Sequence, residues 1–179
     1  MDTLLTIVGI IAGIIAVVVL LALIAPKGYT VVRSIVINKP RQLVYNYVKF
    51  LGNQQYYNKW VMMDPNKRTS ATGTDGTVGY NSTWDSDVKQ VGKGNQTIEG
   101  LVDGERIDIR IVFERPMPGV ADIYIATQSV TEDSTAVKWS MQSKMPFPMN
   151  AMLLVINMYK LLGKDLDESL SNLKRELEK

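Results

Sequence analysis

Residues 147–179 read FPMNAMLLVINMYKLLGKDLDESLSNLKRELEK, and apolar side chains recur three or four positions apart along this whole stretch. That spacing is typical of one face of an α-helix. The stripe consists of Met149, Met152, Leu153, Ile156, Tyr159, Leu162, Leu166, Leu170, Leu173 and Leu177. A helix from 148 to 178 would be about 46 Å long at ~1.5 Å per residue, which exceeds the length of an ordinary strand. We therefore expect one long helix that lies across several strands.

The two halves of this predicted helix differ in composition. Residues 149–162 are apolar nearly all round, whereas charged residues occur on every turn from Gly163 onward. We therefore expect the first half to be buried and the second half to be partly exposed. Glycine in a helix interior costs about 1 kcal/mol relative to alanine, so Gly163 indicates either a bend or the close approach of a neighbouring element.

A second long apolar segment runs from Leu4 to Ala25 without a charged residue. As a helix it would span about 33 Å, which is enough to cross the ~30 Å hydrocarbon core of a bilayer. A secretory signal peptide is the competing interpretation. It fits less well, because the residues before the segment carry no positive charge, the segment is long, and Pro26 follows the only small-residue cleavage point. The sequence predicts a retained anchor over residues 1–26 and a folded domain over residues 27–179.

The residues that flank the predicted anchor bear on its topology and its association. Lys27 follows it and Asp2 precedes it, so the positive-inside rule favours a single-pass inner-membrane protein whose folded domain is cytoplasmic. Gly9 and Gly13 form a GxxxG pair, which would let two anchors pack closely as a weak homodimer.

The composition of the remaining chain excludes several function classes. It carries all 20 Lys and Arg and all but one of the 18 Asp and Glu, with no basic cluster, so we expect no nucleic-acid binding. Cysteine and histidine are both absent. Zinc sites, thiol nucleophiles and histidine-dependent triads are thereby excluded, and we expect no cofactor or metal. The glycine-rich segments 73–79 and 92–94 do not join a strand to a helix, so we interpret them as turns.

The chain between the two long segments predicts an α+β domain. Residues 29–37 are rich in Val and Ile and predict a first strand, and residues 40–60 predict two short helices. Residues 64–76 are dense in polar and turn-forming residues, and we expect a loop there. Apolar residues then alternate with polar ones over five further segments, which is typical of antiparallel strands with one covered face. The order predicts a sheet of about six or seven strands wrapped around the C-terminal helix.

Six segments carry a resemblance to a known superfamily. They are VVRSIVINKPRQLVYNYV (31–48), NKWVMMDPN (58–66), TVGYNSTWDSDVKQVGKGNQTI (77–98), ERIDIRIVFERP (105–116), VKWSMQSKMPFPMNAM (137–152) and GKDLDESLSNLK (163–174). In this order they resemble the SRPBCC superfamily, the START and birch-pollen-allergen helix-grip group, in its bacterial polyketide-cyclase-like branch. The resemblance implies a helix-grip fold that encloses an apolar cavity between sheet and helix. The N-terminal apolar helix departs from the usual pattern of this group.

The predicted concave face of the sheet and the apolar face of the helix supply candidate ligand contacts. Methionine adapts to varied apolar shapes, and ligand pockets are apolar with a few polar groups. A filled core is the alternative interpretation of the same pattern. The candidate ligand-binding residues are Tyr56, Trp60, Tyr80, Ser82, Trp84, Gln96, Ile109, Ile111, Phe113, Ile123, Ile125, Trp139, Met141, Met149, Met152, Leu153 and Ile156.

Together these features predict a membrane-anchored domain that binds a hydrophobic small molecule, such as a lipid or an isoprenoid-like compound. We expect binding and not catalysis. One alternative is an enzyme of the cyclase or dehydratase kind, in which Tyr80 or Tyr56 would donate a proton. Another is a protein-interaction module like the chaperone-activating relatives in the same superfamily.

Overall fold

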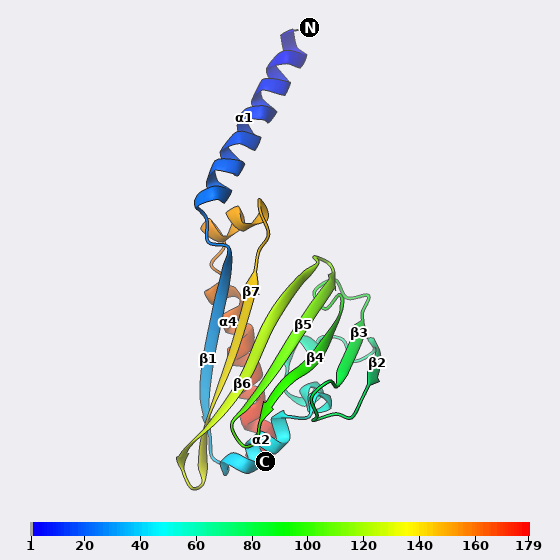
Figure 1. Cartoon of the computed structure of the whole chain (residues 1–179), viewed down its shortest axis with the longest axis vertical. Coiled ribbons are helices and arrows are strands. Elements are labelled where there is room, and N and C mark those ends of the chain that lie inside the picture. Colours follow the sequence, from blue (N-terminus) through cyan, green and yellow to red (C-terminus); the bar gives the residue numbers. More distant parts are fainter. Residues whose placement is uncertain (1) are drawn as a thin grey trace.

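The structure, a computed structural model, describes residues 2–179. A long N-terminal helix precedes a curved sheet (Figure 1). Short helices follow the first strand, and a C-terminal helix packs against the sheet. The elements are α1 (Asp2–Ile24), β1 (Gly28–Ile37), α2 (Arg41–Val48), η1 (Leu51–Tyr56), α3 (Lys59–Met62), β2 (Arg68–Thr72), β3 (Asn81–Asp85), β4 (Lys93–Val102), β5 (Arg106–Arg115), β6 (Gly119–Thr131), β7 (Ser134–Lys144), η2 (Met149–Leu154) and α4 (Met158–Leu177).

The sheet has seven antiparallel strands in the order β1-β7-β6-β5-β4-β3-β2. The alternation of apolar and polar residues sets its register, because a shift by one residue would turn every apolar side chain to the other face. One row on the concave face pairs Ile98 with Ile109, Ile109 with Ile123, and Ile123 with Met141. The predicted α+β class and helix-grip architecture are confirmed.

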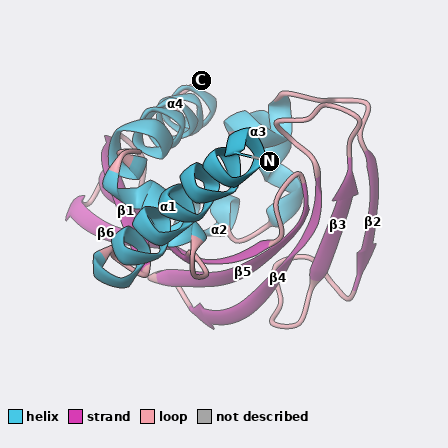
Figure 2. Cartoon of the chain, turned by 90° about the horizontal axis from the view of Figure 1, so that it is seen from above, coloured by secondary structure: helices cyan, strands magenta, loops and turns pink. Residues whose placement is uncertain are grey.

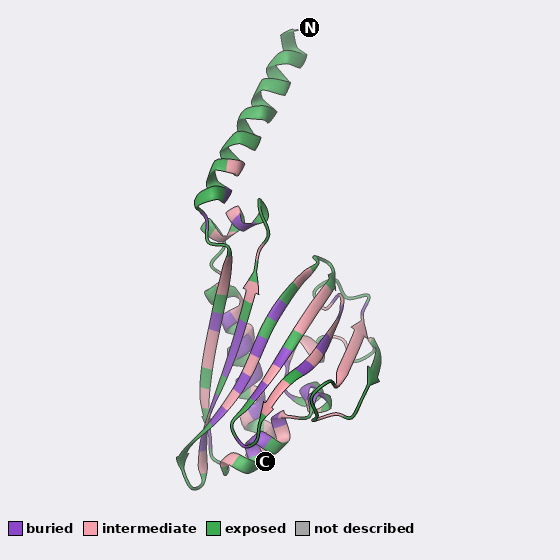
Figure 3. Ribbon diagram, viewed as in Figure 1, coloured by how far each residue is buried: buried purple, intermediate pink, exposed green. Residues whose placement is uncertain are grey.

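Helix α4 packs on the concave face beside β1, and this contact forms the centre of the core. Leu166, Leu170 and Leu173 are at most 1% exposed, and they pack among apolar residues of the inner strands and of α2. Figure 3 shows buried positions on both α4 and the central strands. The expected burial of the two halves is therefore wrong, since the charged half of the C-terminal stretch contains the core stripe and the apolar half is mostly exposed.

The C-terminal stretch is also not one continuous helix. A short 3₁₀-helix, η2, covers Met149–Leu154, and α4 begins only after Asn157. The side chain of Asn157 accepts a hydrogen bond from the backbone N–H of Lys160 at 3.0 Å. Asparagine satisfies a free N–H better at a helix start than in a helix interior, so this residue begins a new helix instead of continuing the first.

Gly163 marks a close approach, one of the two outcomes expected for it. A Cβ atom at this position would overlap the guanidinium of Arg33 on β1. That guanidinium donates hydrogen bonds to the backbone oxygen of Tyr159 at 2.9 Å and to Asp167 at 3.1 Å, and it lies over the Tyr159 ring. The missing side chain therefore gives Arg33 its place between β1 and α4.

One predicted loop contains a strand. Residues 64–76 include β2, which pairs with β3 at the edge of the sheet and has every residue exposed. Its sequence RTSAT shows no apolar alternation, because neither face of this strand packs on a core.

Helix α1 extends away from the folded domain (Figure 1). Its side chains are almost all exposed apart from Ala22, and it is long and apolar enough to be a membrane span or a signal sequence. It meets the domain only at its C-terminal end, against η2. An apolar surface of this size in water would be strongly unfavourable, which hints at membrane association.

Candidate functional site

The main cavity of the domain lies between the concave face of the sheet, the segment η1–α3 and the start of α4. Its volume is about 750 Å³, within the range of small-molecule sites. Several of its lining residues, including Thr69 and Ser70 of β2 and Gln90, are exposed, so the cavity opens toward this edge of the sheet. Its lining residues include Tyr29, Leu51, Gln54, Asn58, Trp60, Lys67, Tyr80, Ser82, Trp84, Gln96, Ile109, Ile111, Phe113, Ile123, Trp139, Met141, Leu162 and Leu166.

Trp84 forms the outer apolar wall and is held firmly in place. Its indole N–H donates to the backbone oxygen of Val91 at 3.1 Å, and its ring meets that of Phe113 edge-on, with centroids 6.2 Å apart. The indole also lies over Gly94 on the neighbouring strand, where any Cβ would collide with it. A Cβ here would also collide with the backbone oxygen of Val112, so this position requires glycine.

The inner apolar wall is formed by the central strands. Trp139 is 4% exposed, and its ring packs edge-on against that of Tyr57 at 6.0 Å between centroids. Met141 and Ile123 pair across β7 and β6 and lie beside it in the wall. All 3 tryptophans of the chain, Trp60, Trp84 and Trp139, line this one cavity.

Two buried amides interrupt the apolar lining. Gln54 is 3% exposed, and its carbonyl oxygen accepts a hydrogen bond from the Asn58 amide at 3.2 Å. Its own amide nitrogen and the side-chain amide of Gln96 have no hydrogen-bond partner among residues 2–179. A buried amide usually has a partner, so both groups are available to a polar atom of a ligand or to water in the cavity.

Tyr80 and Ser82 place hydroxyl groups on the same wall. Burial raises the pKa of the Tyr80 phenol, the negative charge of Asp75 acts in the same direction, and a hydrogen bond with Ser82 opposes them. The phenol is therefore protonated at neutral pH and can donate a hydrogen bond. A phenol with a raised pKa is, however, a weaker acid than usual.

Lys67 is the only charged residue that lines the cavity within residues 2–179. Its ammonium donates to the backbone oxygens of Val61 at 2.7 Å and of Asp64 at 2.9 Å, at the end of α3. An ammonium has three donors, so one remains. Burial lowers the pKa of Lys67, although the charge of Asp64 opposes this effect. The side chain thus caps a short helix and presents one donor beside the cavity.

The structure brings most of the predicted site residues together. Those that line the cavity are Trp60, Tyr80, Ser82, Trp84, Gln96, Ile109, Ile111, Phe113, Ile123, Trp139 and Met141. Apart from Trp60 on α3 and Tyr80 just before β3, these residues lie on strands, where the alternation correctly assigned the concave face.

The other predicted site residues lie elsewhere. Tyr56 is 53% exposed at the end of η1, and Ile125 is enclosed in the solid core. The residues Met149, Met152, Leu153 and Ile156 lie near the end of α1 and do not line the cavity. Their placement differs from the expectation because the C-terminal stretch breaks at Asn157, and only α4 reaches the sheet.

Sequence reasoning missed several lining residues. Tyr29, Leu162 and Leu166 come from β1 and α4, and Gln54, Asn58 and Lys67 come from the segment between the first two strands. Leu162 and Leu166 could have been found from their place in the helical stripe. The polar residues had no such signal, because their position depends on how η1 and α3 fold over the sheet.

A second, smaller groove of about 450 Å³ lies between the start of β1 and the segment 153–159. Tyr29 lines both this groove and the main cavity. Burial raises the pKa of its phenol, and a hydrogen bond with Ser143 opposes this effect. The groove therefore lies next to the end of α1, with a single residue in common with the main cavity.

Comparison with known proteins finds similarity in structure only. No protein-family model matches the sequence, and no curated protein matches it. Among solved structures, a structural-genomics protein from Chromobacterium violaceum is 17% identical, with a TM-score of 0.59 over 84% of this chain and 97% of that one. A structural-genomics protein from Mesorhizobium loti has 11% identity and a TM-score of 0.60, covering 84% of this chain and 97% of its own.

A plant enzyme is similar to the same extent. The norcoclaurine synthase of Thalictrum flavum, a point mutant bound to a transition-state analogue, is 11% identical, with a TM-score of 0.60 over 85% of this chain and 97% of that one. At these identities the similarity shows the fold alone. It is a helix-grip fold, with seven antiparallel strands and a C-terminal helix.

Proposed function

We propose that this protein binds an amphiphilic small molecule, lipid-like or isoprenoid-like, in the cavity between its sheet and α4. The observation that carries the proposal is the cavity of about 750 Å³ with an apolar wall and a few unpaired polar groups. Proteins of this fold often enclose hydrophobic ligands, which supports the same conclusion. The residues that line this cavity are proposed as the ligand contacts.

The affinity that such a cavity can provide is moderate. Removing ~300 Å² of apolar ligand surface from water gives about 7 kcal/mol at ~25 cal/mol/Å². Part of this free energy is lost in restricting the ligand, so we expect a dissociation constant in the micromolar range at best. Binding of this strength is useful where the ligand is locally concentrated, as it is beside a bilayer.

The polar groups suggest a ligand with an anionic head. Gln54 and Gln96 have free amides inside the cavity, and Lys67 has one free donor at its edge. A carboxylate or phosphate can accept hydrogen bonds from donors of these kinds, and charge-assisted bonds are the stronger kind. A long apolar tail would then lie against Trp84, Trp139 and the aliphatic wall.

We further propose that α1 is a membrane anchor and that the folded domain is cytoplasmic. The exposed apolar length of α1 supports the anchor, and Lys27 at its end supports the topology. The chain should remain in the membrane fraction after alkaline and high-salt washing, and a reporter fused after Lys179 should show a cytoplasmic location. A soluble protein that starts near Pro26 would end the anchor proposal, and a periplasmic reporter signal would reverse the topology.

An enzyme of the polyketide-cyclase-like branch is the second candidate, favoured by the structural similarity to a synthase. Tyr80 would be its proton donor. Tyr56 is unsuited to this role because it lies outside the cavity. The raised pKa of Tyr80 makes it a weak acid, and no carboxylate lines the cavity within residues 2–179. Turnover that is lost in Tyr80→Phe would favour the enzyme. A stoichiometric protein partner without any small ligand would favour an interaction module.

The tryptophans provide a direct test of binding. The full chain is reconstituted in phosphatidylcholine vesicles and titrated with dibromostearic acid, whose bromine atoms quench only nearby indoles. We expect saturable quenching, because all 3 tryptophans line the cavity and α1 contains none. The methyl ester of the same acid serves as the uncharged control. Absence of saturable quenching by both compounds, with the chain folded, would contradict the proposal.

A further inference from the structure

An uncharged segment lies between the sheet and α4. No charged residue occurs from Met145 to Tyr159, and several large apolar side chains in it are exposed. Val155 is 87% exposed, Phe147 is 56% exposed and Leu154 is 48% exposed. We call residues 147–156 the apolar segment. A contiguous group of exposed apolar residues usually marks a surface that another apolar medium covers.

The apolar segment is fastened to the end of α1. The side-chain amide of Asn150 donates to the backbone oxygens of Ala22 at 2.7 Å and of Ala25 at 3.4 Å. These carbonyls lie at the C-terminus of α1, where a helix has no partners of its own for them. Asn150, Ala22 and Ala25 are all buried in this contact. Figure 1 shows η2 directly beside the end of α1 and at the far side of the sheet from the β6–β7 hairpin.

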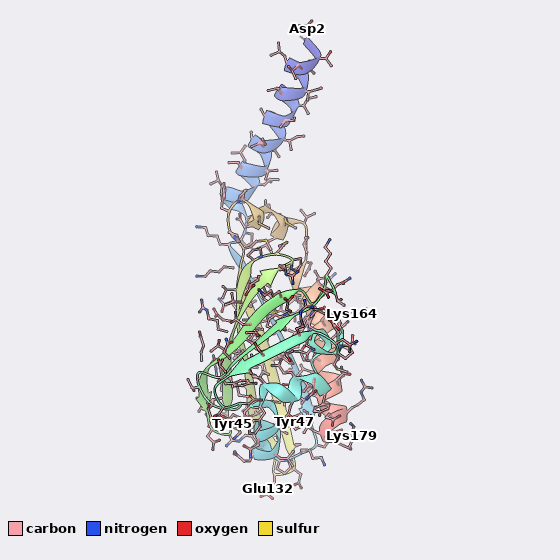
Figure 4. All side chains as sticks on the ribbon, turned by 90° about the vertical axis from the view of Figure 1, so that its right-hand side faces the viewer. Asp2, Tyr45, Tyr47, Glu132, Lys164 and Lys179 are labelled. Carbon is pink, nitrogen blue, oxygen red and sulfur yellow. The ribbon has the colours of Figure 1, made fainter. Side chains whose placement is uncertain are left out.

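Four lysines precede or follow this region in the chain. Lys27 and Lys144 lie where the chain enters β1 and leaves β7, and the N–H of Met145 donates to the oxygen of Lys27 at 3.0 Å. Lys160 and Lys164 follow the apolar segment on the first turns of α4 (Lys164 is labelled in Figure 4). All four are exposed, and none forms an ion pair within residues 2–179.

We propose that the apolar segment enters the surface of the bilayer that holds α1, and that the four lysines bind anionic lipid headgroups around it. This inference rests on the proposed anchor. The segment has the composition of an interfacial element, with an aromatic and aliphatic part for the acyl boundary and basic residues for the headgroups. Its direct attachment to α1 places it at the depth where a spanning helix leaves the hydrocarbon core.

One consequence concerns the orientation of the domain. A single helix with a flexible linker would let the domain rotate freely, whereas a second contact fastened by Asn150 fixes it against the membrane. The smaller groove, which is lined by residues 153–159 and Tyr29, would then face the bilayer surface. The anchor would thereby hold the shared wall of the main cavity near the lipids.

The absence of cysteine allows a sharp test, because every introduced thiol is unique. The full chain is prepared as Val155→Cys, labelled with an environment-sensitive fluorophore, and reconstituted in vesicles of phosphatidylcholine and phosphatidylglycerol. Val130→Cys is the matched control, since Val130 is also an exposed valine but lies near the distal hairpin that contains Glu132 (Figure 4). Ile14→Cys reports on α1 itself.

We expect lipids brominated on the acyl chain to quench the labels at 155 and 14 severalfold more than the label at 130, and aqueous iodide to do the reverse. If the label at 155 behaves like that at 130 while 14 is quenched by lipid, the inference is overturned and the anchor stands. If aqueous iodide quenches the label at position 14, α1 does not span the bilayer, and both the anchor and this inference are wrong. Lipid quenching at 130 would also overturn it, because the contact would not be confined to the apolar segment. If the label at 155 is quenched by lipid equally in vesicles with and without phosphatidylglycerol, the proposed role of the lysines is overturned.

Discussion

The two ends of the sheet, at β1 and at β2, differ in what covers their concave face. On the β1 side, α4 lies on the concave face and its leucines are almost fully buried. On the β2 side no α4 residue covers the outer strands, every residue of β2 is exposed, and those of β3 are half-buried. Figure 2 shows α4 above one end of the curved sheet and β3 and β2 at the other. The same antiparallel pattern thus forms a solid core at one end and a cavity at the other.

The difference separates the half of the sheet that carries the core from the half that carries the proposed ligand site. The contacts of α4 with the sheet are made mainly to β1, so the helix closes only the half of the concave face beside that strand (Figure 2). Short elements with polar residues, η1 and α3, face the remaining half and leave it incompletely filled. We therefore expect substitutions on the α4 side to change the free energy of unfolding, and those around the cavity to change ligand affinity.

The largest effect should come from Leu170→Ala in the solid half. Leu170 is 1% exposed, and its truncation should cost about 2–5 kcal/mol of unfolding free energy, because a cavity forms where neighbours cannot collapse. Urea unfolding of the full chain in mild detergent, followed by tryptophan fluorescence, measures this cost. Ile111→Ala on the cavity wall is the matched control and should cost clearly less, since it enlarges an existing space. Equal costs would break the comparison.

Lys67→Gln should weaken binding of dibromostearic acid by about tenfold or more, because a charge-assisted hydrogen bond contributes roughly 1.5–3 kcal/mol. Binding of the methyl ester should hardly change. As the pH rises through the pKa of Lys67, which lies below the usual lysine value, the ammonium loses its charge and the affinity of the native protein for the acid should fall. The variant should lack this pH dependence. Unchanged binding of the acid would show that the head group lies elsewhere.

Ser82→Leu separates an open cavity from a packed core. Ser82 lines the cavity between Tyr80 and Trp84, so the larger side chain should enter free space and leave the melting temperature unchanged or raised. Binding of dibromostearic acid should weaken several-fold, because ligand volume is lost. A close-packed face would instead cost about 1–3 kcal/mol of overpacking strain. A destabilised variant together with no detectable ligand would end the binding proposal.

The smallest effect concerns Gly163→Ala at the boundary between β1 and α4. Alanine favours the helix by about 1 kcal/mol, but its Cβ must displace the Arg33 guanidinium from Tyr159 and Asp167. We expect a net loss of about 1 kcal/mol in unfolding free energy. In an Arg33→Ala background the same substitution should become stabilising by about that amount. A stabilising effect in both backgrounds would show that Arg33 moves aside without cost.

Sequence periodicity was sufficient for the sheet and much of the cavity wall. Alternation placed Ser82, Ile111 and Trp139 on the concave face, and the register confirms this assignment. Periodicity failed for β2, because an edge strand exposed on both faces needs no apolar residues. It also could not find Gln54 or Lys67, whose approach to the cavity follows from long-range folding.

The amino-acid pattern alone determined the fold class, the face of each central strand and the presence of an apolar N-terminal helix, because these depend on local spacing and composition. The tertiary structure decided where the C-terminal stretch packs. Residues 149–156 are more hydrophobic than residues 166–173 and were expected to be more deeply buried, yet the opposite is found. Asn157 starts a new helix, Asn150 caps α1, and only α4 can reach the sheet. Burial is a property of the surface that a segment meets, and the sequence does not state which surface that is.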